Sequence, residues 1–232
     1  MKALPHKLIP LPNADKGFHE SVKKLDKNKA NYPHPYRCAC VGAPNSGKST
    51  LAANLIMHQD PPFERVVVWH CDPETKEWDH TTDELVSECP KMEDFDPEQK
   101  TCCVIDDIAL KSLGRDERMR LDRLCGNWST HRNISIILTS QQPNQLPASI
   151  RRMMNVYCLW RSTDAQSLKD IALKCGIDSR DLNSLLSLLE GPKDSLCIDL
   201  TGSPYRYRRN IFEVIEEAWL QFLSLPYVKP TI

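Results

Sequence analysis

The chain has 232 residues, of which 41% are hydrophobic and 26% charged, and its formal net charge is −1 at pH 7. This is the composition of a globular protein with one sizeable core. The small net charge excludes a general electrostatic attraction to nucleic acid, so any binding of nucleic acid must come from local patches. No apolar run is long enough to span a membrane and the N-terminus lacks the apolar core of a signal peptide, so we expect a cytosolic or nuclear protein that is not secreted.

The N-terminal residues 1–35 are rich in proline, have few periodic apolar positions and carry a cluster of lysines over 23–29. We expect an extended basic arm that wraps the following domain or contacts a neighbour. A solvated lysine face is the alternative interpretation.

The strongest motif is the segment 42–50, GAPNSGKST, which fits the pattern G-x-x-x-x-G-K-[ST]. The strand-like run 36–41 precedes it and the helix-like run 51–57 follows, which is the context that a phosphate-binding loop requires. Its glycines let backbone N–H groups point at phosphate oxygens, and a helix N-terminus adds partial positive charge. Lys48 then neutralises the β- and γ-phosphates and Ser49 holds Mg²⁺; a chance glycine loop is the alternative. The residues predicted to bind the nucleotide are Gly42, Ala43, Pro44, Asn45, Ser46, Gly47, Lys48, Ser49 and Thr50.

The middle of the chain alternates between strand-like and helix-like patterns. The polar, acidic segment 71–100 predicts one short helix around residues 83–87 among loops, and residues 116–130 have helical apolar spacing. Strands that alternate with helices indicate a mainly parallel sheet with helices on both faces, joined by right-handed crossovers. The strands predicted after the loop are 65–70, 101–107, 134–141 and 155–160.

Beyond residue 161 the pattern becomes that of a smaller, mixed part. A capping box at 163–166 opens a helix that ends near Gly176, and a second, leucine-rich helix ends at 191–192. Residues 195–209 indicate a β-hairpin, and residues 212–223 indicate a last amphipathic helix. We therefore divide the chain into the arm 1–35, the phosphate-loop core 36–161 and a C-terminal part 162–232 packed on the core.

Polar side chains end two of the predicted strands. A carboxylate at a strand tip facing the phosphate loop can hold Mg²⁺ through water, and a second carboxylate can orient or activate the attacking water. We assign Asp106 to the metal and Asp107 to the water; two solvated aspartates are the alternative. Gln141 ends the fourth strand, where a polar group can contact the γ-phosphate or the water, although an ordinary polar strand end has the same appearance.

The chain contains ten cysteines, which raises the question of disulfides or a metal site. No two of them have C-x-x-C spacing, which argues against zinc. Half of them lie in apolar strand-like runs, where a free thiol behaves as a small buried hydrophobe. We expect reduced core thiols, as in a reducing compartment. The five are Cys38, Cys40, Cys102, Cys103 and Cys158.

Aromatic and basic residues alternate over 205–209, on the second strand of the predicted hairpin. Alternation places Arg206 and Arg208 on one face, where they are candidates for contacts to DNA phosphates. A charged edge strand that resists pairing with other chains is the alternative.

Taken together, the patterns G-x-x-x-x-G-K-S, V-I-D-D, H-R-N-I-S-I-I-L-T-S-Q-Q-P and L-P-x-S-I-R-R-x-x-N resemble the FtsK–HerA superfamily of P-loop ATPases, over roughly residues 36–212. Within it, the chain is most similar to the DNA-packaging ATPases of poxviruses, other large double-stranded DNA viruses and virophage- or Maverick-like elements. The most specific part is the strand that ends in Ser140-Gln141, together with the segment 146–151 that follows it.

The resemblance implies a RecA-like three-layer α/β sandwich with a mainly parallel sheet in the order 5-1-4-3-2 and a small C-terminal helical and hairpin appendage. It also implies that ATP and Mg²⁺ are bound, with Asp106 and Asp107 as the Walker B pair and Gln141 as the sensor glutamine. Lys48 and Ser49 would bind MgATP.

One departure from the family concerns the arginine finger. The family's arginine before the fourth strand would fall at Thr130, and the nearest arginine here is Arg132. Arg132 is expected at the end of the sheet opposite the phosphate loop, so it would act on the nucleotide of a neighbouring subunit. Arg151 and Arg152 are the alternatives, and a surface salt bridge is the other interpretation for all three.

The resemblance implies an ATP-driven translocase of double-stranded DNA that packages a viral genome into a capsid. Its expected partners are DNA, further copies of the chain in a ring, and capsid or portal-like viral proteins. It would act in the host cytoplasm or nucleus at the site of virus assembly, or in the virion. Two other classes remain open: another P-loop enzyme, such as a nucleoside or small-molecule kinase, and a nucleotide-dependent assembly switch. Activity on a small-molecule acceptor without DNA would favour the first, and absence of turnover the second.

Overall fold

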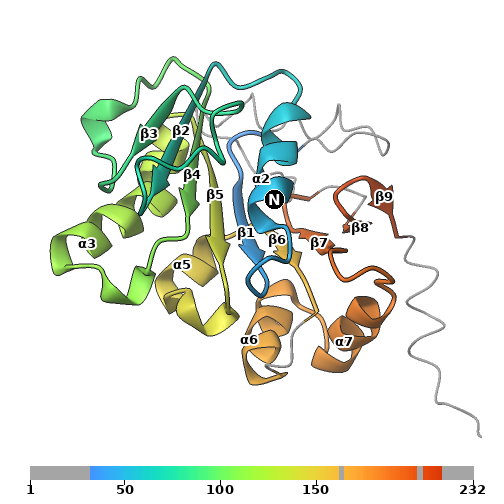
Figure 1. Cartoon of the computed structure of the whole chain (residues 1–232). Helices are drawn as coiled ribbons and strands as arrows, with labels where there is room; N and C mark the ends of the chain where they lie inside the picture. The colour runs from blue at the N-terminus through green and yellow to red at the C-terminus, as the bar shows by residue number, and fades with distance from the viewer. Residues whose placement is uncertain (1–31, 162–164, 203–205, 216–232) are drawn as a thin grey trace, which may run out of the picture.

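The computed structural model describes residues 32–161, 165–202 and 206–215. In these residues one nine-stranded sheet forms the centre of the molecule, with strand order β3-β2-β4-β5-β1-β6-β7-β8-β9 (Figure 1). The first six strands in sequence pair in parallel, and the last three extend the sheet antiparallel beyond β6. The strands are β1 Arg37–Val41, β2 Arg65–His70, β3 Glu84–Val86, β4 Thr101–Asp106, β5 Ile134–Ser140, β6 Val156–Leu159, β7 Leu196–Asp199, β8 Tyr207–Arg209 and β9 Glu213–Val214.

The five predicted core strands occupy the predicted order, because β6, β1, β5, β4 and β2 are consecutive neighbours in the sheet. These strands are buried on both faces and rich in Val, Ile and Cys, as parallel strands covered by helices must be. Alternation along β1 sends Cys38 and Cys40 into one core and Ala39 and Val41 into the other. The predicted three-layer α/β sandwich is therefore confirmed.

Helices cover both faces of this sheet. Helix α2 packs its buried side, from Leu51 to Ile56, on the face that carries Cys38 and Cys40, whereas residues of α3, α5, α6 and α7 belong to the core on the other face. None of the helices in the described ranges has the length and apolar character needed to span a bilayer. The helices are α2 Lys48–Met57, α3 Arg115–Arg123, α4 Ser129–His131, α5 Ala148–Met153, α6 Ala165–Cys175 and α7 Ser179–Ser187, with a π-helical turn at Leu124–Trp128 and 3-10 turns at Met92–Asp94, Leu110–Ser112 and Pro143–Gln145.

One prediction for the middle of the chain is wrong. Residues 84–86, expected in a short helix, form the edge strand β3, which pairs in parallel with Val67–Trp69 of β2. The side chain of Asp83 fixes this arrangement, because its Oδ2 accepts the backbone N–H of Val66 at 2.7 Å. Pairing with a buried neighbouring strand outweighs weak local helix preference over so short a segment.

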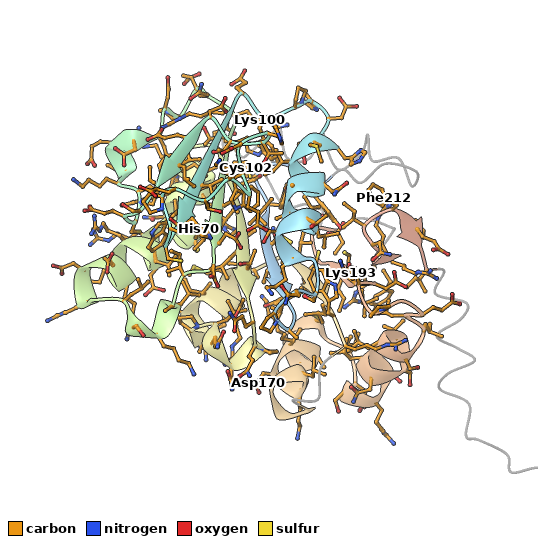
Figure 2. The ribbon with its side chains drawn as sticks, in the orientation of Figure 1. His70, Lys100, Cys102, Asp170, Lys193 and Phe212 are labelled. Atoms are coloured by element: carbon orange, nitrogen blue, oxygen red, sulfur yellow. The ribbon has the colours of Figure 1, made fainter. Side chains whose placement is uncertain are left out.

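The C-terminal part follows the predictions as far as the hairpin and then departs from them. The expected hairpin is present as β7 and β8, but residues 212–215 form a turn and the strand β9 in place of a helix start. The turn is set by Asn210 and Ile211, whose φ angles are 50° and 62°. Phe212, labelled in Figure 2, packs its ring against that of His58 after α2, with ring centroids 5.0 Å apart. Residues 216–223 of the predicted helix, Thr163 of the predicted capping box and residues 1–31 of the predicted arm lie outside the described residues.

Candidate nucleotide-binding site

The phosphate-loop segment 42–50 connects the carboxyl end of β1 to the first turn of α2. The backbone N–H of Gly42 donates to the carbonyl of Ser140 at 3.1 Å, which fixes the loop to the end of β5. A Cβ on Gly42 would lie 2.7 Å from Ser46 Oγ and 2.9 Å from the Trp160 ring, so only glycine fits here. Gly47 has a φ of 99°, which also favours glycine. The predicted strand–loop–helix context is present.

The start of α2 is suited to an anion. Its first turn contains no acidic residue, and no side chain caps it. Four backbone N–H groups at a helix N-terminus have no partner within the helix, and the helix dipole adds partial positive charge there. Ser46 Oγ is buried without a hydrogen-bond partner among the described residues.

Lys48 is the first residue of α2 and lines the cavity in front of the loop. Its Nζ donates to the carbonyl of Ala43 at 2.9 Å, so in this state the lysine is bonded to its own loop. Burial lowers the pKa of Lys48, while the nearby carboxylates of Asp106 and Asp107 act in the opposite direction. Burial has the larger effect, so the pKa of Lys48 is lowered overall.

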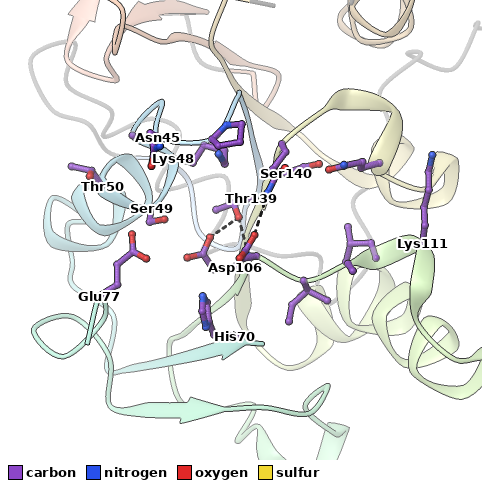
Figure 3. A pocket seen from close by; sticks show the side chains of 18 of the residues that line it. Asn45, Lys48, Ser49, Thr50, His70, Glu77, Asp106, Lys111, Thr139 and Ser140 are labelled. Atoms are coloured by element: carbon purple, nitrogen blue, oxygen red, sulfur yellow. Dashed lines mark hydrogen bonds between the residues drawn. The ribbon is translucent and has the colours of Figure 1, made fainter. Parts of the chain in front are cut away.

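Asp106 ends β4 and is held by two donors. Its side chain is buried, and Oδ1 accepts from Thr139 Oγ1 at 2.5 Å (Figure 3). Its Oδ2 accepts from Trp78 Nε1 at 3.0 Å. Each carboxylate oxygen has a second lone-pair site, so both bonds are compatible with ligation of a cation. The two donors fix the carboxylate in one orientation, as the partners of metal ligands do.

Asp107 lies one residue further on and has an exposed side chain. Its φ of 53° turns the chain sharply, and its backbone N–H donates to Thr139 Oγ1 at 3.3 Å. Gln141 Nε2 donates to Asp107 Oδ1 at 3.5 Å, and Cys71 Sγ lies 3.9 Å from Asp107 Oδ2. The two predicted water-directing residues are therefore in contact with each other, although the sequence places them on different strands.

These groups surround one cavity of about 650 Å³. Six of the nine predicted loop residues line it, together with Asp106, Asp107 and Gln141. His70 and Glu77 also line it, as do two cations that the sequence analysis missed, Lys111 and Lys193. The carbonyl of Lys193, which is labelled in Figure 2, accepts from Trp160 Nε1 at 3.0 Å, and this bond fixes the backbone of Lys193.

His70 could have been found from the sequence, since it ends the strand next to β4 and is the register partner of Asp106. Glu77, Lys111 and Lys193 lie on irregular segments, and no pattern in the sequence places them at the site.

Arg132 does not line this cavity. It precedes β5 at the amino end of that strand, whereas the phosphate loop is bonded to Ser140 at the carboxyl end. This is the location that the sequence analysis expected. Of the two alternative arginines, Arg151 pairs with Asp170 at 2.9 Å and Arg152 is exposed.

The predicted DNA-contacting face of the hairpin needs a correction. Arg208 is 3% exposed and its Nη1 donates to the carbonyl of Ile211 at 3.4 Å, so its side chain is directed into the protein. Arg206 is half-buried and its Nη2 donates to the carbonyl of Cys175. The two side chains do not form an exposed row, because the added strand β9 and helix α6 pack around them.

All ten cysteines are free thiols, and Cys71 is the exposed one. Four of the buried thiols lie in a group across β1, β6 and β7. The Sγ atoms of Cys158 and Cys197 are 3.0 Å apart, and Cys38 Sγ lies 3.7 Å from that of Cys158 and 3.9 Å from that of Cys40. Burial raises the pKa of Cys38 and Cys158, which keeps both as neutral thiols.

The sheet order, the loop and the paired aspartates define a P-loop NTPase fold of RecA-like architecture. Solved structures similar to it include the DNA-packaging ATPase B204 from Sulfolobus turreted icosahedral virus, with a TM-score of 0.53 and 12% identity over 82% of this chain and 100% of that chain. The pCW3 conjugation coupling protein TcpA, in its monomer form with ATPγS, has a TM-score of 0.54 and 12% identity over 86% of this chain and 65% of that chain. The cytoplasmic domain of the type VII secretion ATPase EccC from Thermomonospora curvata has a TM-score of 0.52 and 12% identity over 84% of this chain and 28% of that chain.

At these identities the likeness is one of fold, and it confirms the fold that the resemblance in the sequence implied. No protein-family model matches the sequence, and no curated protein matches it either.

Proposed function

We propose that the chain is an ATPase that hydrolyses MgATP and uses the cycle to move double-stranded DNA into a viral capsid. The observation that carries the ATPase proposal is the cavity that joins the phosphate loop to Asp106, Asp107 and Gln141. The DNA-packaging part is supported by the resemblance in the sequence and by the shared fold of B204, a DNA-packaging ATPase, and TcpA, a conjugation coupling protein.

Each residue of the site has its own role in the proposed phosphoryl transfer. Lys48 exchanges the Ala43 carbonyl for phosphate oxygens, and the N–H groups at the start of α2 bind the same oxygens. Ser49 and Asp106 would hold Mg²⁺, which neutralises charge that develops on the phosphates. Asp107, with Gln141 in contact, orients the attacking water. Positioning and charge neutralisation are most of what this reaction requires.

A ring of identical subunits completes the proposed site. Arg132 lies away from its own cavity, so it would serve the nucleotide of a neighbour and stabilise the equatorial oxygens. Lys111 and Lys193 supply further positive charge from the same chain. A contribution from cations of the same chain can therefore be tested beside the contribution of Arg132 from a neighbouring chain.

The deciding experiment measures ATP hydrolysis with and without double-stranded DNA, with the size of the oligomer determined in the same buffer. We expect turnover that DNA stimulates and that is lost in Lys48→Ala. Lys76→Ala is the matched control, because Lys76 is an exposed lysine outside the cavity. Undiminished hydrolysis in Lys48→Ala would refute the site, whereas turnover on a small-molecule acceptor without DNA would indicate a kinase. Binding without turnover would indicate an assembly switch.

A further inference from the structure

We propose that His70 and Glu77 join Asp106 as direct ligands of the divalent cation, so that the ion bound with the nucleotide has an imidazole nitrogen in its coordination sphere. This inference rests on the proposed nucleotide site and adds to it two residues outside the Walker motifs. It also predicts which class of cation the site prefers.

The three ligand groups converge on one point. One ligand atom from each of His70, Glu77 and Asp106 lies within 4.8 Å of the other two. An octahedral ion with bonds of about 2.1 Å places neighbouring ligands about 3.0 Å apart and opposite ligands about 4.2 Å apart, so the three groups move closer together when they bind a cation. Figure 3 shows the three side chains turned toward a common space, with Ser49 at its border.

The loop after β2 is built to present Glu77. The next residue, Trp78, is 1% exposed, and its Nε1 donates to Asp106 Oδ2 at 3.0 Å. Its carbonyl accepts the backbone N–H groups of Thr81 and Thr82 at 3.0 and 3.1 Å. The indole of Trp78 therefore fixes this irregular segment to the carboxylate of Asp106. Glu77 precedes Trp78 in the sequence, so the same contact places Glu77 at the cavity.

His70 has the environment of a metal-ligating histidine. It is buried at the end of β2, as the register partner of Asp106. Its Nδ1 lies 2.9 Å from the carbonyl oxygen of Asp72, to which it donates in one tautomer, and 3.0 Å from the backbone N–H of the same residue, from which it accepts in the other. Donation of the Nδ1 proton to that carbonyl leaves the Nε2 lone pair for an ion, and a backbone carbonyl is a common partner of ligating imidazoles. Cation binding would select this tautomer.

An imidazole ligand changes the preferred cation. Mg²⁺ favours oxygen ligands, whereas nitrogen donors raise affinity along the series that runs from Mn²⁺ upward. We therefore expect the nucleotide complex to bind Mn²⁺ more tightly than Mg²⁺, and we expect this preference to depend on His70.

The test uses pulsed EPR of Mn²⁺ bound to the full chain with a non-hydrolysable ATP analogue. Coupling to ³¹P reports that the ion is bound with the nucleotide, and coupling to ¹⁴N reports an imidazole ligand. Labelling the protein with ¹⁵N-histidine should convert the ¹⁴N signal to a ¹⁵N signal in the unmodified sequence, so the result does not depend on any variant folding.

Paired variants then identify the ligands. His70→Gln should abolish the nitrogen coupling and Glu77→Gln should retain it, and each should lower Mn²⁺ affinity in the nucleotide complex by about 10-fold or more. His80→Gln and Glu74→Gln are the matched controls, since both are exposed residues of the same loop that do not line the cavity. Phosphorus coupling without histidine coupling overturns this inference and leaves the nucleotide site intact. Absence of any nucleotide-dependent Mn²⁺ binding overturns the proposed function itself, and this inference with it.

Discussion

Thr139 joins the two aspartates of the site through a single hydroxyl. Its Oγ1 donates to Asp106 Oδ1 at 2.5 Å and accepts the backbone N–H of Asp107 at 3.3 Å. The hydroxyl therefore sets the orientation of the carboxylate assigned to the metal and the position of the residue assigned to the water. A residue on β5 thus controls the geometry of residues at the end of β4.

This relationship predicts the effect of Thr139→Val, which keeps the shape of the side chain and removes the hydroxyl. We expect ATP hydrolysis to fall by about 10–100-fold, the usual cost of losing a group that orients a metal ligand. Thr139→Ser should restore most of the activity, because it returns the hydroxyl. Denaturant unfolding of the same variants is the control, with a loss of about 1–3 kcal/mol expected because Asp106 Oδ1 loses its hydrogen-bond donor. Equal rates for Thr139→Val and the unmodified chain would contradict this role.

The two aspartates should separate in their effects on binding and turnover. Asp107→Asn should still bind MgATP but hydrolyse it slowly, because the water is no longer directed. Asp106→Asn should weaken the dependence of nucleotide binding on Mg²⁺. Titration of a fluorescent ATP analogue with and without Mg²⁺ measures both, and equal binding defects in the two variants would rule out the division of roles.

The proposed contribution of Arg132 to a neighbouring site is tested by mixing subunits. Arg132→Ala and Lys48→Ala should each be inactive alone, because one lacks the donated arginine and the other the phosphate-binding lysine. Mixed rings contain interfaces that pair an intact Lys48 with an intact Arg132, so partial hydrolysis should return. Full turnover of Arg132→Ala alone excludes this arginine, and Arg151 and Arg152 should then be tested in the same way.

Cys71 should be the one thiol that a reagent labels in the native state, because it is exposed and the other nine are buried. We expect one equivalent of a maleimide to react without denaturant, and none with Cys71→Ser. Its Sγ lies 3.9 Å from Asp107 Oδ2, so a non-hydrolysable ATP analogue with Mg²⁺ should slow the labelling. Rapid labelling of several thiols would be inconsistent with the described core.

Lys100 should make the free energy of unfolding depend on pH in the alkaline range. Burial lowers its pKa from 10.5 to about 8. The unfolded chain therefore holds more protons than the folded chain between these two values, so the contribution of this group to the unfolding free energy rises as pH increases through that window. Lys100→Met should flatten this part of the profile, measured by chemical denaturation from pH 7 to 10. Lys91→Met, at an exposed lysine, is the control and should leave the slope unchanged.

The parts of the site that the sequence predicted are those at the ends of regular strands. Parallel strands bring their carboxyl ends to one edge of a sheet, so Asp106, Asp107 and Gln141 could be assigned to the edge that carries the phosphate loop. The same argument applies to His70, which ends the strand next to that of Asp106 and is its register partner. The order of the core strands followed from a family pattern rather than from local propensity.

The remaining parts depend on packing between segments far apart in the chain. Glu77 reaches the cavity because Trp78 is bonded to Asp106, a contact that no periodicity encodes. Residues 84–86 form a strand because β2 offers an unpaired edge. Arg208 alternates with tyrosine as an exposed strand residue would, but β9 and the turn before it enclose its side chain. Each of these outcomes required knowledge of which neighbour covers the segment.

The uninterrupted sheet has a mechanical consequence for the cavity. Hydrogen-bonded ladders connect β8 to β7, β7 to β6 and β6 to β1, whose carboxyl end carries the phosphate loop. Such a sheet behaves as a stiff plate, so a load applied to its C-terminal strands is transmitted as tension and shear to β1 rather than absorbed by a hinge. Because β1 and β4 belong to the same sheet, force on that edge would move the loop and Asp106 together and leave their spacing unchanged.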